Sequence, residues 1–566
     1  MTTYKMYLLL GPQVSKQRFA CCPQDVFLHV FNHTLEYMDW NDYELMAKDA
    51  KRRGFGEQGT GFNKTLSADE KKLSEKLFKQ YNFNAFASDH ISLERSIGDT
   101  RSDVCKTKQY LKNIPPASVS IILCFHNEKN STILRSIHSI INRSPKHLLK
   151  EIVLVDDFST DEELKKPLEM YTQQHFPIVR IVRNTRRQGL IRTRMIGANT
   201  TSGDILVFLD AHVEVNYNYL PPLIEPIVLD YRKIVCPLVD AIDHQTMNIR
   251  RSLDSSRGAF SWDLVYQHLP VFQKDKSAPH PVPVMMGSVF AISRRWWEEI
   301  GRYDPGLEVW GGEQYEISFK SWMCGGSVVD SPCARVAHLF RPLPYVSEVT
   351  KDHLVDRNYL RVAKVWMDEY IEYVFQRRPI MRKIDPGNLT EQIAVRKRLN
   401  CKSFKWYLTD VAPDLLKIYP PIEPPNKAWG LLRNIYNKSA CVFKEPSGWL
   451  LLGSCLQSDN NFYVYDWRQH IKLSNKCFTR ANLVGIFMAG CYDYEQVPNQ
   501  QFVWDHKTGR IVNFVTKYCM DVNRQTQQVV MAQCNVSTIT QSWMFDYFNS
   551  TLVNEAWEKH RAELNM

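Results

Sequence analysis

The sequence predicts an α/β domain built around a mostly parallel sheet, followed by a small all-β domain. Between residues 118 and 215, short apolar runs alternate with segments of helical periodicity. Later in the chain, three pairs of cysteines recur with separations of 14, 14 and 15 residues. With 566 residues, of which 44% are hydrophobic and 23% charged, the chain is long enough for two or three packed domains.

The order of its segments predicts the α/β domain. Apolar runs predict strands at 119–125, 152–155, 179–182 and 205–209, separated by helices at 131–142, 161–173 and 189–199. This βαβαβ order is typical of a Rossmann-like, mostly parallel sheet. Nearer the N-terminus, residues 68–81 have helical periodicity, and Ser67 is placed to cap that helix.

The segment 205–215, with the sequence ILVFLDAHVEV, carries the main chemical signal. If it runs as one extended strand, the side chains of Asp210 and His212 point the same way. Ligands of open α/β sheets bind at the carboxyl ends of strands, where Asp157 ends a second strand. Oxygen and nitrogen ligands suit a divalent cation such as Mn²⁺. An isolated D-x-H is more often a capping Asp beside a surface His, so this interpretation depends on the rest of the chain.

The three cysteine pairs belong to a weak internal repeat between residues 430 and 548. Each repeat also carries an aromatic near Gln or Asn, namely Phe462-Tyr463, Phe502 or Trp543. Repeats too small for separate cores must bury these aromatics together, which predicts a β-trefoil. One small disulfide loop in each repeat predicts an oxidising compartment. Nine N-x-S/T sequons also favour a lumenal protein: Asn32, Asn63, Asn130, Asn142, Asn199, Asn388, Asn437, Asn535 and Asn549.

Charge and hydropathy limit the partners that we expect. The net charge is +10, but the basic residues are scattered, so we expect no nucleic-acid partner. The apolar run 6–10 is too short for a signal core, and no later run reaches the roughly 18 apolar residues of a membrane span. For a lumenal protein this predicts a truncated or misannotated N-terminus, or an unusual isoform.

Eight motifs occur in order along the chain: SIGDTR (96–101), FHNE (125–128), LVDD (154–157), GLIRTR (189–194), DAH (210–212), WGGE (310–313), HLFR (338–341) and VWMDEY (365–370). Their order and spacing resemble the polypeptide N-acetylgalactosaminyltransferases, from about Gly54 to Asp546. The resemblance implies a GT-A catalytic domain followed by a ricin-type β-trefoil lectin domain. It also implies retaining, Mn²⁺-dependent transfer of GalNAc from UDP-GalNAc to Ser or Thr of polypeptides, which starts mucin-type O-glycosylation. Such enzymes are type II membrane proteins of the Golgi, and their anchor is not visible in this sequence.

The resemblance also implies roles for particular residues. Asp210, His212 and His338 match the metal ligands, and Asp210, Trp310 and Glu313 match catalytic positions. The positions that match UDP-GalNAc contacts are Asp157, Arg187, Arg194, Gly287, Ser288, Trp310, Arg341 and Tyr345. In the lectin part, Asp521 is the only carboxylate that matches the sugar-binding position.

The sequence also predicts the domain boundaries and the disulfide pairs. We expect a stem and clasp (1–115), the catalytic domain (116–400), a linker with a Pro-rich end (401–429), the trefoil (430–550) and a tail (551–566). The resemblance implies Cys105–Cys333 and Cys324–Cys401, beside the repeat pairs Cys441–Cys455, Cys477–Cys491 and Cys519–Cys534. Cys124 and Cys236 lie in apolar strands, and we expect them to be buried thiols.

Three departures from the family pattern leave two other functions open. Ser288 stands where Gly is usual, Gln314 stands for Asn, and residues 346–351 lack the usual Gly pair of the closing loop. Glycine allows close approach to a sugar, and closing loops need backbone freedom. One alternative is a catalytically weak or inactive glycan- or peptide-binding protein on the same scaffold. A weaker alternative is a related enzyme that uses another UDP-sugar.

Overall fold

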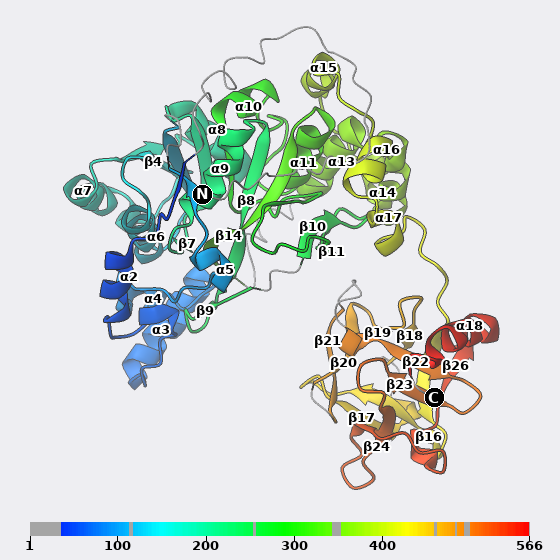
Figure 1. Cartoon of the computed structure of the whole chain (residues 1–566). Coiled ribbons are helices and arrows are strands. Elements are labelled where there is room, and N and C mark those ends of the chain that lie inside the picture. The colour runs from blue at the N-terminus through cyan, green and yellow to red at the C-terminus, as the bar shows by residue number, and fades with distance from the viewer. Residues whose placement is uncertain are drawn as a thin grey trace, which may run out of the picture.

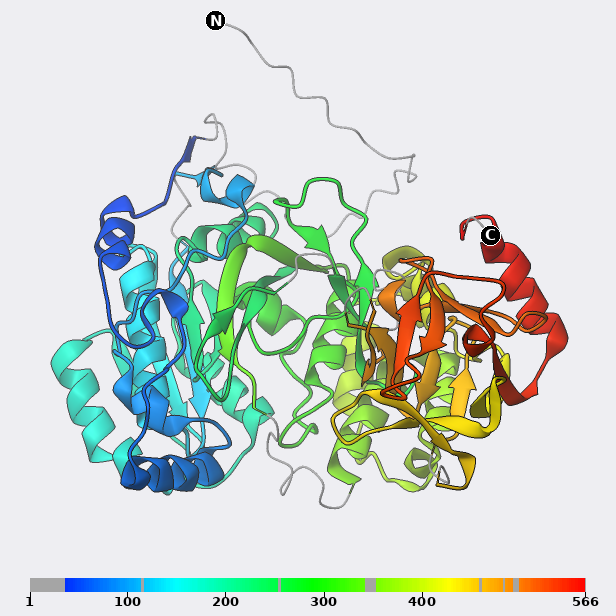
Figure 2. The ribbon, with the colours of Figure 1, turned by 90° about the horizontal axis from the view of Figure 1, so that it is seen from below.

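The computed structural model describes residues 36–112, 117–252, 256–341, 353–457, 461–481, 484–491 and 498–564. An α/β domain with an N-terminal helical segment is followed by an all-β domain, as Figure 1 shows. Figure 2 gives the perpendicular view, with the all-β domain in yellow, orange and red. The predicted fold classes of both domains are confirmed.

A mixed sheet, ten-stranded over the described residues, forms the centre of the α/β domain. Its order is β12-β14-β8-β13-β6-β3-β4-β5, with β7 on β14 and β9 on β8. The strands β3 to β6 are mutually parallel where they pair, and β13 runs antiparallel between β6 and β8. Their bounds are β3 (Val119–Phe125), β4 (Leu149–Asp156), β5 (Val179–Arg183), β6 (Ile205–Asp210), β7 (Val213–Val215), β8 (Lys233–Ile242), β9 (Ile249–Arg250), β12 (His280–Pro281), β13 (Phe290–Ser293) and β14 (Ser327–Leu339).

Both faces of this sheet are buried. Ile121 and Leu123 of β3 pack on one face, together with α6 (Asn130–Arg143) and α9 (Leu220–Leu229). Ile122, between them, faces the opposite core, which also holds α8, α11 and α13. These helices are α8 (Leu190–Thr200), α11 (Glu313–Met323) and α13 (Leu354–Trp366). Alternate side chains of a strand point to opposite faces, so a strand buried on both faces is mostly apolar, as β3 is apart from Ser120, whose hydroxyl donates to Glu151.

The predicted helix 161–173 is interrupted. A short 3-10 turn covers Glu162–Leu164, and α7 (Lys166–His175) begins after Lys165. Pro167 lies in the first turn of α7 and has no N–H to donate to the preceding turn. The proline therefore separates the two helical pieces.

The N-terminal segment is part of the α/β domain. It contains β1 (Tyr37–Met38), α2 (Tyr43–Ala50), α3 (Ala68–Tyr81), α4 (Ala85–His90), α5 (Asp103–Lys106) and β2 (Tyr110–Leu111). The predicted cap of α3 is confirmed, because Ser67 and Glu70 form a capping box. Phe83 packs against Ala337 and Leu339 of β14, and Arg95 makes a buried ion pair with Glu214 of β7. The predicted stem is thus a clasp that contacts the strands of the site.

The predicted linker is too long. Phe404, Tyr407 and Leu415 are buried in the core beneath α11, within α16 (Phe404–Trp406), a π-helical turn (Tyr407–Val411) and α17 (Leu415–Ile418). The aromatic side chains of residues 404–407 stabilise this part by packing in the core, whereas the Pro-rich residues that follow lie outside that core. The connection between the domains is therefore confined to about residues 420–427.

Smaller elements complete the α/β domain. They are the hairpin β10 (Ser256–Phe260) and β11 (Tyr266–Pro270), α10 (Arg294–Glu299), α14 (Ile371–Arg377), α15 (Thr390–Arg398) and short 3-10 turns at Asp368–Tyr370 and Pro379–Lys383.

The all-β domain buries one shared set of aromatic and aliphatic side chains, including Phe478, Trp504 and Trp543. Its strands are β15 (Ala428–Asn434), β16 (Asn437–Lys444), β17 (Leu450–Ser454), β18 (Tyr463–Tyr465), β19 (Ile471–Leu473), β20 (Lys476–Arg480), β21 (Ile486–Gly490), β22 (Phe502–Asp505), β23 (Arg510–Asn513), β24 (Cys519–Val522), β25 (Val529–Ala532) and β26 (Trp543–Phe548). The predicted tail is instead a helix, α18 (Ser550–Arg561), whose Val553 enters the same core. The repeat unit alone did not reveal that packing.

The disulfides join the five expected pairs: Cys105–Cys333, Cys324–Cys401, Cys441–Cys455, Cys477–Cys491 and Cys519–Cys534. Cys124 and Cys236 are free and buried, as expected. Among the described residues, no helix combines the length and the apolar character needed to cross a bilayer.

Candidate active site

Asp210 and His212 are brought together by a turn. β6 ends at Asp210, Ala211 and His212 form the turn, and β7 starts at Val213. The strand therefore ends where the sequence predicts, but the extended geometry expected between Asp210 and His212 is wrong, because Ala211 and His212 turn the chain. β6 is parallel to β3, whereas β7 pairs antiparallel with β14, so the chain must turn when it changes partners. The turn places His212 beside the end of β14, where Val213 pairs with His338.

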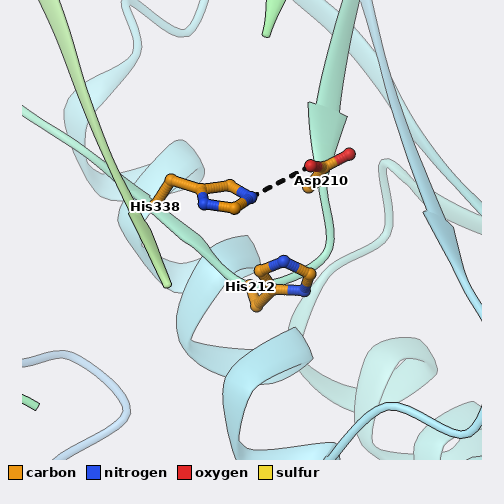
Figure 3. Close-up of side chains that lie close together, drawn as sticks. All are labelled: Asp210, His212 and His338. Carbon is orange, nitrogen blue, oxygen red and sulfur yellow. Dashed lines mark hydrogen bonds and ion pairs between the residues drawn. The ribbon is translucent and has the colours of Figure 1, made fainter. Parts of the chain in front are cut away.

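Asp210, His212 and His338 form a compact cluster of possible metal ligands (Figure 3). One ligand atom from each lies within 4.8 Å of the others. His338 Nε2 is 3.1 Å from Asp210 Oδ2, and the two imidazole rings are 4.8 Å apart. Burial opposes ionisation of Asp210, but the hydrogen bond from His338 and the charge of Arg194 outweigh it and hold its pKa well below the usual range. Burial lowers the pKa of His338, which favours the neutral imidazole that a metal requires.

Glu128 supports this cluster, although it was not among the site residues predicted from the sequence. Its Oε2 accepts from His212 Nδ1 at 2.8 Å, and its Oε1 accepts from Arg341 Nη2 at 2.5 Å. Only 2% of Glu128 is exposed, and the charges of Arg341 and His212 overcome the effect of burial to lower its pKa. A carboxylate that holds one imidazole nitrogen leaves the other for a metal. Its position in FHNE, directly before α6, was the available signal.

A cavity of about 450 Å³ opens in front of the cluster. Its lining includes every proposed donor contact that lies in the described part of the chain: Asp157, Arg187, Arg194, Gly287, Ser288, Trp310 and Arg341. Glu313 also lines it, as do residues 80–82 from the N-terminal segment. Tyr345 and the loop 346–351 lie outside the described residues.

Asp157 holds one end of the cavity in place. Its carboxylate accepts from the backbone N–H groups of Gln188 and Gly189, at 2.7 and 2.8 Å, and from Asn184 Nδ2 at 2.9 Å. Arg187 also pairs with it. The ends of β4 and β6 therefore contribute to one cavity, where Asp157 fixes the segment before α8.

Arg194 connects the metal-ligand cluster to the segment 286–288. Its Nη1 donates to Gly287 O at 2.8 Å, and its Nη2 donates to Asp210 Oδ1 at 3.0 Å. Gly287 has φ +93°, so its backbone is in the region that glycine tolerates best. The neighbouring Ser288 has a buried hydroxyl without a partner among the described residues.

The WGGE motif forms the opposite wall. Gly311 and Gly312 have φ values of +91° and +94°, which turn the chain into α11. Trp310 is 39% exposed at the mouth of the cavity. Glu313 is buried at the first position of α11, and its Oε2 has no partner in the described structure. Burial raises the pKa of Glu313 above its ordinary value. Because Glu313 lines the cavity, its unpartnered Oε2 can form a hydrogen bond with a ligand.

Comparison with known proteins decides the family. Residues 120–301 match the glycosyl transferase family 2 model, and residues 428–543 match the ricin-type beta-trefoil lectin domain. Human polypeptide N-acetylgalactosaminyltransferase 10 is 43% identical over 91% of this chain and 87% of its own length. Drosophila melanogaster N-acetylgalactosaminyltransferase 6 is 41% identical over 91% of this chain and 80% of its own.

The chain belongs to the polypeptide N-acetylgalactosaminyltransferase family. A crystal structure of GalNAc-T7 with UDP, GalNAc and Mn²⁺ agrees, with a TM-score of 0.63 and 33% identity over 88% of this chain and 93% of that one. The protein is thus a glycosyltransferase with a GT-A domain and a ricin-type lectin domain.

In the lectin domain, the carboxylate of Asp521 already has hydrogen-bond partners within the protein. Its Oδ2 accepts from Gln541 Nε2 at 3.0 Å, and its Oδ1 accepts from the N–H of Val522 at 2.7 Å. Both oxygens therefore already bind within the third repeat. A sugar-binding role for Asp521 stays a prediction.

Proposed function

We propose that this protein transfers N-acetylgalactosamine from UDP-GalNAc to Ser and Thr hydroxyls of polypeptides, with retention of configuration. The convergence of Asp210, His212 and His338 beside a cavity carries this proposal, together with the family relationship. One carboxylate oxygen and two imidazole nitrogens fit a divalent cation of Mn²⁺ type. The relative GalNAc-T7 was crystallised with Mn²⁺, UDP and GalNAc, which supports the same cofactor and donor here.

The residues of the cavity have distinct roles in this proposal. Asp210, His212 and His338 would hold a divalent cation, whose positive charge would stabilise the negative charge on departing UDP. Arg341 would donate to a phosphate, since its guanidinium is suited to paired contacts with such oxygens. Asp157 and Arg187 would contact the uridine end, with Tyr345 beside the diphosphate. Arg194, Gly287, Ser288 and Glu313 would surround the sugar.

The reaction would be a front-face displacement. The acceptor hydroxyl attacks the anomeric carbon from the side that UDP leaves, and its proton passes to the departing β-phosphate oxygen. No pair of catalytic carboxylates at glycosidase spacing is needed for this route. Trp310, exposed at the mouth, would cover the diphosphate, and fixed charges would supply most of the stabilisation of the transition state.

The compartment follows from the same chemistry. Five disulfides require an oxidising environment, which supports the Golgi lumen as the place of action.

The direct test is an assay of the purified protein with UDP-GalNAc, Mn²⁺ and a panel of Ser/Thr-rich peptides and glycopeptides. Mass spectrometry should find peptides that have gained one N-acetylhexosamine, and a panel of UDP-sugars should show UDP-GalNAc as the preferred donor. Absence of transfer by folded protein, beside an active enzyme of the same family, would refute the proposal. UDP binding without transfer would instead favour a binding protein on this scaffold.

A further inference from the structure

Two aromatic rings form an exposed platform at one end of the all-β domain. Trp429 of β15 and Tyr547 of β26 are directly paired across the two strands. Their rings stack with centroids 6.1 Å apart and an angle of 19° between the planes. Trp429 is 38% exposed and Tyr547 is 60% exposed, so both aromatic side chains are partly open to solvent. Aromatic ring faces bind the C–H face of a sugar by the same contacts that stack aromatic rings.

Asn549 lies two residues beyond Tyr547 and begins the sequon Asn549-Ser550-Thr551. Side chains two residues apart in an extended chain point to the same side, and Asn549 is extended, with φ −93° and ψ 106°. Its N–H donates to Lys427 O at 2.8 Å, which keeps the segment beside β15. Of the nine sequons in the sequence, this is the one with an aromatic residue two positions before its Asn.

The side chain of Asn549 is oriented by the helix that follows. It caps α18, and its Oδ1 accepts from the N–H of Leu552 at 3.2 Å. That contact uses the carbonyl oxygen and leaves Nδ2, the atom that N-glycosylation modifies. The cap and a glycan are therefore compatible, because a glycosylated Asn keeps its carbonyl oxygen.

We propose that Asn549 carries an N-linked glycan whose first sugar stacks on the platform of Tyr547 and Trp429. The proposal rests on the lumenal location given under the proposed function, since N-glycans are added to chains that enter the secretory pathway. The glycan would shield the platform from solvent and hold the start of α18 against β15. Phe548, which lies between Tyr547 and Asn549 in the sequence, contacts Trp504 and His506. These contacts anchor this end of β26 to the core.

The test expresses the full chain behind a cleavable secretion signal in animal cells, which separates the modification from the native location. Peptide N-glycosidase F converts a glycosylated Asn to Asp, and mass spectrometry of the peptide containing Asn549 then measures occupancy. Wild type should be occupied at Asn549, and Thr551→Ala should lose one glycan while keeping the Asn cap. Asn549→Asp should also lose it, with another good capping residue in place. Ser439→Ala, which removes the sequon at Asn437, should leave Asn549 occupied.

Thermal unfolding tests the contact between glycan and ring. Thr551→Ala and Tyr547→Ala should each lower the melting temperature, and the double variant should lose less than the sum of the two. An unmodified Asn549 in secreted protein with all five disulfides formed would overturn the modification. Occupied Asn549 with fully additive shifts would overturn the stacking. Transfer to peptides should be unchanged in Thr551→Ala, so failure of this inference is distinguishable from failure of the proposed transferase activity.

Discussion

The guanidinium of Arg341 lies over the ring of Phe83, with its Cζ atom 5.0 Å from the ring centroid. The same guanidinium donates to Glu128, which in turn holds His212. Phe83 belongs to the N-terminal segment, directly after α3, and packs against β14. The N-terminal segment therefore supports the proposed phosphate contact and, through Glu128, a proposed metal ligand.

This contact predicts a graded effect on donor binding. Phe83→Leu keeps most of the buried volume but removes the cation–π interaction, which is worth about 0.5–2 kcal/mol. We expect the Kd for UDP, measured by calorimetry in the presence of Mn²⁺, to rise by roughly 2- to 30-fold. Phe83→Tyr should retain wild-type affinity, and Phe55→Leu, on the exposed side of the same segment, should have no effect. Equal affinities for the Leu and Tyr variants would show that Phe83 only fills space.

Glu128 gives a second prediction. Glu128→Gln keeps the shape of the side chain but removes the charge that orients His212 and Arg341. Partners of metal-binding histidines typically contribute a factor of about 10–100 in metal affinity, so we expect the Mn²⁺ concentration for half-maximal activity to rise by that order. The matched control is Glu94→Gln, whose carboxylate pairs with His138 away from the cavity. An unchanged Mn²⁺ requirement in Glu128→Gln would contradict a supporting role.

Ser288 predicts a contact with the donor sugar. The buried hydroxyl of Ser288 has no partner among the described residues, and such a hydroxyl is costly unless a ligand satisfies it. Ser288→Ala should therefore raise the KM for UDP-GalNAc by about 2- to 10-fold, with a smaller change in the KM for peptide. Steady-state kinetics with each substrate varied separately measures this, and Ser447→Ala on the all-β domain is the control. If Ser288→Ala leaves the KM for UDP-GalNAc unchanged, the hydroxyl does not contact the donor.

Asp330 predicts how stability changes with pH. It lies in β14 between His280 and Cys236 of the neighbouring strands, and burial raises its pKa to about 8 from the ordinary 3.8. Between these values the folded protein keeps a proton that the unfolded chain has released. The carboxyl of Asp330 therefore contributes its full stabilisation below a pH of 3.8, and this stabilisation is lost as the pH rises to about 8.

Asp330→Asn should remove this loss, so its advantage in melting temperature over wild type should grow from about pH 5 to about pH 8. Differential scanning fluorimetry across that range checks it, with the partly exposed Asp230→Asn as the control. A difference that is the same at every pH would mean that Asp330 does not titrate in this window.

The strands at the centre of the fold were predictable because each carries its own pattern. The run Val119–Phe125 is apolar except for Ser120, as expected of a strand buried on both faces. Because ligands bind at the carboxyl ends of such strands, Asp157 and Asp210 could be predicted as site residues from the sequence alone. Pro167 could have indicated the break in the predicted helix 161–173, but the helical periodicity continues on both sides of it and favoured a single helix.

The rest of the site depends on contacts that periodicity cannot show. His338 lies 128 residues beyond Asp210, and only the family resemblance connected it to the metal-ligand cluster. Glu128 acts through His212 and Arg341, and its own surroundings in the sequence indicate only the start of a helix. The packing of Phe404 and of α18 depends likewise on partners far along the chain.

We propose that one divalent cation, held by Asp210, His212 and His338, is required for sugar transfer. The most direct measurement is GalNAc transfer to a Ser/Thr peptide by protein stripped with a chelator, then titrated with Mn²⁺. We expect no transfer by stripped protein, full recovery with Mn²⁺, and no recovery in a folded His338→Ala variant at the same Mn²⁺ concentrations. Transfer at the wild-type rate by the stripped protein, or by His338→Ala, would contradict it.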